Sequence, residues 1–387
     1  MKNQSKRILQ YFFYRNNKVG AFFRLAAKRA ILNKMSFRSC NGAITMPETL
    51  MIRITNRCNL HCFFCGQHGE RGVFEGSSAR PNEKELSISQ WKDFIKNARY
   101  FKPYIYITGG EPLLRDDTVE LIKFASSLDI ITHLNTNSTL LSDKAEDLVN
   151  AGLDYISCSL DCIGSLSEEI TGKSSTYKDA ITGIERLVKA RSVSKGKFPI
   201  IQVFTTINKK NQHCLFDIAK TSEALGVDVF AVSFPIFTTP ELEQKTSISF
   251  REKLGVEPKF WKGFISDMSQ IDCNLIEKQI KLIRESRFGF RYKQFPSPVK
   301  GFSVYNHFRL PAAVHGDKVC MIPWSMAIIL PNGEVSTCWD HPDYIVGNIC
   351  KEKFSDIWNG EKYRKFRKII KKEFFPSCSR CTGLYFN

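Results

Sequence analysis

The chain has 387 residues, of which 43% are hydrophobic and 25% charged, and these ordinary globular values exclude wholesale disorder. Its formal net charge of +17 favours anionic partners, but the basic residues are dispersed, and a solvated lysine-rich surface is the preferred interpretation. Thirteen cysteines are an odd number in a chain too long to depend on disulfide bonds, so clustered cysteines indicate metal binding in a reducing compartment.

Residues 1–46 form a basic, aromatic segment with apolar residues at helical spacing. This spacing predicts a helix pair packed against the following domain, and peripheral membrane contact is the less favoured alternative. The sequence holds no apolar run of about 18 residues and no clear cleavable signal, so we expect a cytoplasmic protein without a transmembrane helix.

Residues 47–235 alternate between apolar β-type runs and helical patterns. The strand-like runs are 51–55, 104–108, 130–136, 154–160, 200–207 and 228–234, and the helical patterns are 87–100, 117–128, 142–151, 177–190 and 212–225. Ser87 and Ser142 are candidate helix caps. This order predicts an α/β fold in which βα units build a parallel sheet with right-handed crossovers. A barrel-like sheet places its site at the C-terminal ends of the strands.

Three cysteines follow the first predicted strand directly, as Cys58-x3-Cys62-x2-Cys65. Three thiols are one fewer than a closed zinc site or a saturated iron–sulfur cluster requires. Either a fourth ligand comes from elsewhere in the chain, or one metal position is left open. A zinc knuckle or a group of buried thiols is the alternative.

Residues 236–317 break the alternation and predict a helix (272–286), a further strand and a loop that covers the barrel mouth. Residues 318–387 hold four more spaced cysteines, which are Cys320, Cys338, Cys378 and Cys381. A hairpin turn is predicted at 331–333, between the first two of these cysteines. Four thiolates suffice for one closed cluster or for a structural zinc site. Cys350 is a spare ligand or, preferably, a core residue, and the remaining cysteines are expected to be small buried hydrophobes: Cys40, Cys158, Cys162, Cys214 and Cys273.

The sequence "CNLHCFFC", with Phe64 before its third cysteine, resembles the signature of the radical S-adenosylmethionine (radical SAM) superfamily. Three later segments resemble the family's cofactor-binding motifs in their order along the chain: "TGGEP" (108–112), "LNTNS" (134–138) and "SCSLD" (157–161). Ser138 stands where the family usually has glycine. The resemblance implies a partial (β/α)6 TIM-type barrel in which Cys58, Cys62 and Cys65 hold a 4Fe–4S cluster with one open iron. It also implies that S-adenosylmethionine is bound by Phe64, Thr108, Gly109, Gly110, Glu111, Pro112, Thr136, Asn137, Ser159 and Asp161.

The C-terminal pattern is similar to the SPASM/twitch auxiliary-cluster domain, which implies a second 4Fe–4S cluster on Cys320, Cys338, Cys378 and Cys381. The resemblance implies an oxidoreductase that abstracts hydrogen from a small polar, carbohydrate-like substrate and passes an electron to the auxiliary cluster. Maturation of a ribosomally made peptide is the alternative. Flavodoxin or ferredoxin is the expected reductant, and nucleic acid is not a favoured partner.

Oxidation to a carbonyl needs a general base, for which Asp340 and His341 are candidates. A rival of another class is a non-catalytic metal-binding or nucleic-acid-binding protein, which the net charge supports.

Overall fold

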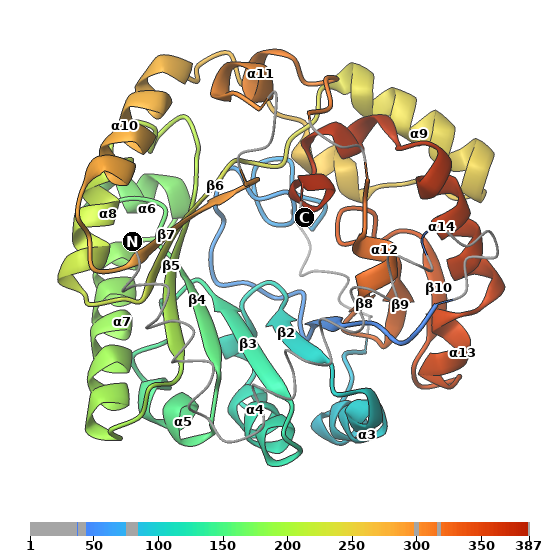
Figure 1. Cartoon of the computed structure of the whole chain (residues 1–387), viewed down its shortest axis with the longest axis horizontal. Helices are drawn as coiled ribbons and strands as arrows, with labels where there is room; N and C mark the ends of the chain where they lie inside the picture. The colour runs from blue at the N-terminus through green and yellow to red at the C-terminus, as the bar shows by residue number, and fades with distance from the viewer. Residues whose placement is uncertain (1–36, 38–43, 75–83, 298–301, 316–318, 386–387) are drawn as a thin grey trace.

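The computed structural model describes residues 37, 44–74, 84–297, 302–315 and 319–385, and its strands form one ten-stranded sheet (Figure 1). The strands are β1 (Thr49–Arg53), β2 (Tyr104–Thr108), β3 (Ile131–Thr136), β4 (Tyr155–Ser159), β5 (Ile200–Thr206), β6 (Val229–Ser233), β7 (Arg291–Phe295), β8 (Met326–Ile329), β9 (Glu334–Ser336) and β10 (Ile345–Asn348). Strands β1 to β7 pair in sequence order and are parallel, which confirms the predicted α/β partial barrel.

The C-terminal strands continue this sheet. Strand β8 lies parallel to β1 on the side away from β2, and β9 and β10 follow in antiparallel order. The register pairs Thr49 with Met326 and Ile52 with Ile329. The C-terminal cysteines therefore belong to a part of the chain that joins the sheet beside β1, the first strand of the barrel.

Helices line the outside of the curved sheet in Figure 1. The helices are α3 (Ile88–Ala98), α4 (Thr118–Ser127), α5 (Ala145–Asn150), α6 (Leu166–Thr171), α7 (Thr176–Val193), α8 (Leu215–Ala224), α9 (Pro240–Leu254), α10 (Cys273–Glu285), α11 (Val304–Arg309), α12 (Ile322–Ser325), α13 (Phe354–Trp358) and α14 (Glu361–Lys372). Short 3-10 helices are η1 (Arg99–Phe101), η2 (Pro112–Leu114), η3 (Phe260–Phe264), η4 (Pro376–Arg380) and η5 (Thr382–Tyr385).

The helix caps agree with the prediction at one of two serines. Ser87 is the N-cap of α3 and forms a capping box with Gln90. Ser142 does not cap a helix, because α5 begins only at Ala145 and the Ser142 hydroxyl donates to Asp143 instead.

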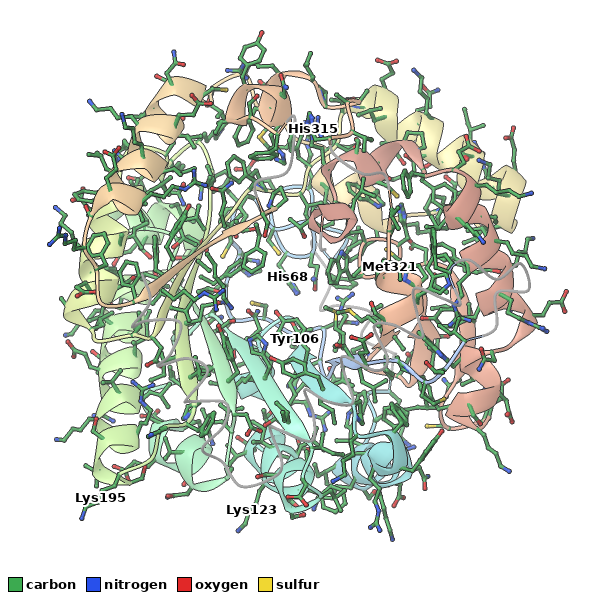
Figure 2. All side chains as sticks on the ribbon, in the orientation of Figure 1. His68, Tyr106, Lys123, Lys195, His315 and Met321 are labelled. Carbon is green, nitrogen blue, oxygen red and sulfur yellow. The ribbon has the colours of Figure 1, made fainter. Side chains whose placement is uncertain are left out.

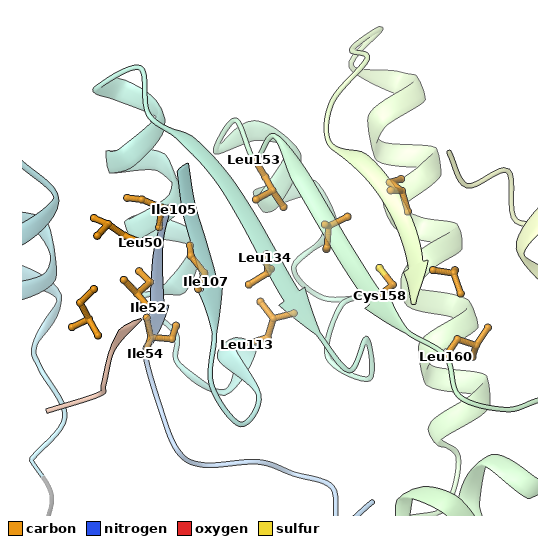
Figure 3. Close-up of a cluster of buried hydrophobic side chains, with 14 of the residues drawn as sticks. Leu50, Ile52, Ile54, Ile105, Ile107, Leu113, Leu134, Leu153, Cys158 and Leu160 are labelled. Atoms are coloured by element: carbon orange, nitrogen blue, oxygen red, sulfur yellow. The ribbon is translucent and has the colours of Figure 1, made fainter. Parts of the chain in front are cut away.

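The core lies between the sheet and the helices that surround it. Ile105 and Ile107 of β2 are fully buried on this outer side, together with Leu134 and Cys158 of the next two strands (Figure 3). The intervening residues of β2 are only half-buried and lie on the concave side. Cys158, Cys162, Cys214 and Cys273 are buried, which confirms their assignment as small hydrophobes.

Two expectations about the ends of the chain have different outcomes. The predicted N-terminal helix pair lies almost wholly outside the described residues, and Cys40 lies outside them as well. In the described part of the chain, no helix is long and apolar enough to cross a membrane.

Candidate functional site

The first three predicted thiols are carried by the segment that follows β1, which we call the cysteine loop (residues 54–74). Inside the loop, the Cys65 amide donates to the Cys62 carbonyl over 2.8 Å, and the Gln67 amide donates to the Cys65 thiol over 3.4 Å. The His61 amide donates to the carbonyl of the last residue of α6 over 2.9 Å. These bonds fix the loop at the C-terminal edge of the sheet, as predicted from its position after a strand.

The turn after β2 lies directly against the cysteine loop. The amide of Gly110 donates to the Thr55 carbonyl over 2.9 Å, and the next amide donates to the Arg57 carbonyl over 2.8 Å. A Cβ on Gly109 would lie 2.3 Å from the Thr55 oxygen, and one on Gly110 would lie 2.1 Å from the Arg57 oxygen. Both glycines are required because the backbone of this turn packs directly against the backbone of the cysteine loop just before Cys58.

Glu111 joins this turn to the turn after β3. Its side chain is 1% exposed and accepts hydrogen bonds from the Leu113 amide, the Thr136 hydroxyl and the Asn137 amide at 2.9, 2.8 and 2.6 Å. Burial raises the pKa of this carboxyl to about 7, and the three donors oppose the rise. Because both carboxyl oxygens are bound by protein donors, Glu111 positions Thr136 and Asn137.

The turn after β3 adopts the backbone that the family's glycine would provide. Ser138 has a φ of 68°, in the left-handed region, so the serine takes this turn at some conformational cost. Asn137 donates from its side-chain amide to Asn59 of the cysteine loop over 2.8 Å, and Asn59 donates to Thr139 over 2.9 Å. Asn59 was not predicted as a site residue, because its only local signal was its place beside Cys58.

The end of β4 brings two more predicted residues to the same edge. Ser159 is half-buried and ends the strand. The Asp161 carboxyl accepts from the Thr206 amide over 2.7 Å, and burial raises its pKa to about 7. Asp161 also lies near Cys62, where its charge helps burial to raise the pKa of the thiol.

The remaining predicted cofactor residues lie around this edge. Phe64 is half-buried and packs edge-on against Phe63, with ring centroids 5.4 Å apart. The Thr108 carbonyl accepts from the Ile54 amide over 3.0 Å, and Pro112 begins η2.

The C-terminal cysteines form a second group. Cys320, Cys338, Cys378 and Cys381 line one cavity, together with Trp261, Asp340 and His341. Burial raises the pKa of the Cys320 thiol to about 12 and raises the pKa of the other three thiols as well. Burial likewise raises the pKa of Cys58 to about 11. Thiols in such surroundings stay protonated until a metal displaces the proton, so metal binding should release protons.

The two groups of thiols fit iron–sulfur clusters. Within the described ranges, no three His, Cys, Asp or Glu side chains converge on a point where they would hold one ion. Each iron of a four-iron cluster takes its own thiolate at a separate corner, so thiols that surround a cluster stand farther apart than those on one zinc. The barrel group offers three thiols and the C-terminal group offers four.

Asp340 and His341 lie in the wall of the C-terminal cavity, where they are 3% and 1% exposed. Asp340 accepts from the Trp339 indole over 2.8 Å, and burial raises its pKa to about 6. His341 Nε2 accepts from the Trp261 indole over 3.0 Å, and burial lowers the pKa of the ring to about 3. This placement gives no support to the prediction that either residue is a general base in contact with substrate.

The segment around η3 contacts the cysteine loop and lines the C-terminal cavity. A Cβ on Gly263 would lie 2.0 Å from the Gly66 carbonyl oxygen, and one on Gly66 would lie 2.5 Å from the Phe264 ring. The indole of Trp261, in the same short helix, donates a hydrogen bond to His341 in the wall of the C-terminal cavity. These residues were predicted only as part of a connection, although "FWKGF", with a glycine between aromatic residues, is a local signal.

Cys350 corrects another expectation. It was expected to pack in the core, but its side chain is exposed, and Gln90 donates to its sulfur over 3.6 Å. It is not among the residues that line the cavity of the other C-terminal cysteines.

Comparison with known proteins agrees with this arrangement. The heme-related relative "Pre-heme d1 synthase" of Dinoroseobacter shibae is 31% identical over 194 residues, which are 49% of this chain and 44% of that protein. The chain thus matches less than half the length of that relative. "AdoMet-dependent heme synthase" of Methanosarcina barkeri is 26% identical over 346 residues, 87% of this chain and 88% of that protein. The crystal structure of Streptococcus suis SuiB bound to S-adenosylmethionine has a TM-score of 0.58 at 16% identity, covers 86% of this chain and 68% of SuiB, and shows a shared fold.

Two family models match the two groups of cysteines. The Radical SAM superfamily model matches residues 52–208, and the SPASM model, described as an iron-sulfur cluster-binding domain, matches residues 320–382. The cofactors of these domains are 4Fe–4S clusters and S-adenosylmethionine. The chain belongs to the radical SAM superfamily and carries a C-terminal SPASM domain.

Proposed function

We propose that this radical SAM enzyme is an oxidoreductase that abstracts hydrogen from a small polar substrate and passes the remaining electron to its auxiliary cluster. The observation that carries the proposal is the backbone pairing of the cysteine loop with the Gly109–Gly110 turn. This pairing brings the three thiols beside the motifs at the ends of β2, β3 and β4. With its cluster and S-adenosylmethionine bound, such a site supplies a 5′-deoxyadenosyl radical by reductive cleavage of the cofactor.

The residues of this chain have separate tasks in the proposal. Cys58, Cys62 and Cys65 hold the barrel cluster. The backbone of Thr108–Pro112 holds the amino group of the cofactor, and Glu111 fixes the Thr136–Asn137 turn beside it. In the proposal, Ser159 and Asp161 contact the ribose, and Phe64 supports the loop.

The C-terminal site accepts the electron left after hydrogen abstraction. Cys320, Cys338, Cys378 and Cys381 would hold the auxiliary cluster in a cavity that is mostly apolar. Buried aromatic rings around His341 keep water from this cavity, with Phe250 stacked on the imidazole at 4.9 Å. A reductant such as flavodoxin or ferredoxin donates electrons to the barrel cluster.

The substrate class separates two versions of the proposal. A carbohydrate-like or otherwise polar small molecule remains our preferred substrate, and a peptide is the alternative. The relative that matches along most of the chain, an AdoMet-dependent heme synthase, supports a small molecule over a peptide.

The test is product formation from S-adenosylmethionine. Anaerobically reconstituted protein with dithionite should form 5′-deoxyadenosine and methionine. Deuterium carried from candidate substrates into 5′-deoxyadenosine then identifies the class. Incorporation from peptides, with none from polar small molecules, would reverse our preference.

A further inference from the structure

The concave side of the sheet carries a row of aromatic and basic side chains below the cofactor edge. Tyr106 of β2, His133 of β3 and Tyr155 of β4 stand side by side, with ring centroids 4.6 and 4.5 Å apart. In Figure 2, Tyr106 lies toward the middle of the ring of elements and not on its outer rim. Tyr106 and Thr108 lie on the same side of β2, two residues apart, so this row lies about 7 Å below the cofactor edge at the usual rise per residue.

Hydrogen bonds connect the row to the next strands. The Tyr155 hydroxyl donates to the side-chain oxygen of Gln202 over 2.7 Å, and the side-chain amide of Gln202 donates to the Ser157 hydroxyl over 2.9 Å. The Ser157 hydroxyl lies 2.8 Å from Nε2 of His133. Since the Tyr155 hydroxyl donates to Gln202, its oxygen remains an acceptor for another group.

That other group is Lys293, which reaches Tyr155 from β7. Its Nζ lies 3.5 Å from the Tyr155 hydroxyl, long for a hydrogen bond, and 5.5 Å from the centre of the ring. Strands β5 and β6 separate β4 from β7, so this side chain spans the concave surface. Ala231 stands opposite Lys293 on β6 and is small enough to leave it room.

No acidic side chain of the described residues forms an ion pair with Lys293. The nearby acid Asp228 is engaged by Arg191, and the other charged neighbour, Arg291, is basic. Burial, with the charge of Arg291, lowers the pKa of Lys293 to about 8. A half-buried ammonium group without a counterion is costly, and an anionic ligand removes that cost.

We infer that Lys293, with Tyr155 and His133, binds a carboxylate or phosphate group of the substrate on the concave face of the sheet. The inference rests on the proposed function and adds the charge of the substrate. A ligand held by Lys293 at one end would extend toward the Gly109–Gly110 edge, where hydrogen is abstracted. His133 stays uncharged beside Tyr155, because burial lowers the pKa of its ring to about 3, so Lys293 is the member of the row that carries a positive charge.

Site-specific labelling of amines tests the inference on the wild-type holoenzyme. A trace of N-hydroxysuccinimidyl acetate acetylates neutral amines, and peptide mass spectrometry gives the rate at each lysine. An anion in contact raises a lysine pKa by about 1 unit or more, so at about pH 8 the labelling of Lys293 should slow about five-fold. Lys278 is exposed on α10 and is the internal control, whose rate should not change.

Acetate and inorganic phosphate are the two probes. Slowing by acetate alone assigns a carboxylate, slowing by phosphate alone assigns a phosphate, and slowing by both supports a site for either group. If neither probe slows Lys293 more than Lys278, the inference is overturned. This result does not depend on cleavage of S-adenosylmethionine, so a failure here is distinguishable from a failure of the proposed function.

Discussion

Gly66 of the cysteine loop and Gly263 of η3 are in such close contact that neither position has room for a side chain. A Cβ on Gly263 would lie 2.0 Å from the Gly66 carbonyl oxygen. Because Trp261, two residues earlier, bonds to His341 in the other cavity, this contact links the barrel site to the auxiliary site. One short 3-10 helix therefore contacts the cysteine loop and the wall of the C-terminal cavity at once.

Gly263→Ala should displace either η3 or the cysteine loop. We expect a loss of about 1–3 kcal/mol in the free energy of unfolding, as for other overpacked sites, together with less iron in the barrel site. Gly196→Ala is the matched control, because an added Cβ there would lie 2.9 Å from the side-chain oxygen of exposed Ser194, which can move away, and in ordinary contact, at 3.6 Å, with the Phe198 carbonyl oxygen. Chemical unfolding and iron analysis of both variants make the comparison, and equal results for the two would contradict the role of this contact.

Replacing Cys58, Cys62 and Cys65 together with alanine should halve the metal content. Reconstituted wild-type protein should hold about eight irons per chain, and the triple variant about four. Cys350→Ser is the control, because this thiol is exposed and outside both groups. One or two zinc ions and no iron in anaerobically purified protein would refute the assignment of both clusters.

Glu111→Gln should weaken S-adenosylmethionine binding without loss of iron. The NH2 group of the glutamine would face an N–H or O–H donor at a place where the carboxylate accepted a hydrogen bond. Two donors in contact should cost about 1–3 kcal/mol in the free energy of unfolding. The Thr136–Asn137 turn should loosen as a result. Equilibrium dialysis with the cofactor measures the change, and unaltered affinity in the folded variant would show that this turn does not contact the cofactor.

The same variant should change the pH dependence of stability. Burial raises the pKa of Glu111 to about 7, above the ordinary glutamate value. Between these values the folded state keeps a proton that the unfolded state has lost, so the free energy of unfolding of the wild type falls as pH rises. The stability deficit of Glu111→Gln should therefore be larger near about pH 5 than near about pH 7 in chemical unfolding of cluster-free protein. A deficit that stays constant or grows with pH would contradict a raised pKa.

Removal of Cys378 and Cys381 should show which reaction step depends on each cluster. Cleavage of S-adenosylmethionine should persist, although more slowly, because η3 joins the two sites. Oxidation of the substrate should fail without its electron acceptor. Substrate oxidation at the wild-type rate in Cys378→Ala/Cys381→Ala would reduce the auxiliary site to a structural role.

Features encoded in short segments were predictable from the sequence. The first seven strands and the cysteine spacing depend on local apolar runs and on motifs at strand ends, and the predicted strand ranges differ from the observed ones by at most a few residues. The left-handed backbone at Ser138 could not be predicted, because serine rarely adopts it and the neighbouring turns impose it.

Contacts between distant segments were not predictable in this way. The pairing of β1 with β8 joins residues more than 270 positions apart, and neither strand indicates its partner. The approach of Lys293 to Tyr155 likewise requires the curvature of the sheet across two intervening strands. Asp340 and His341 were chosen for their chemistry alone, and only the packing of Trp261 and Phe250 shows that His341 is buried in the wall of the C-terminal cavity, beside Asp340.

The most direct measurement is the formation of 5′-deoxyadenosine by anaerobically reconstituted protein supplied with dithionite and S-adenosylmethionine. We predict that wild-type protein and Cys350→Ser form 5′-deoxyadenosine and methionine in equal amounts, and that the Cys58/Cys62/Cys65 triple alanine variant forms neither. Failure of iron-loaded wild-type protein to cleave the cofactor, or cleavage by the triple variant at the wild-type rate, would contradict the account.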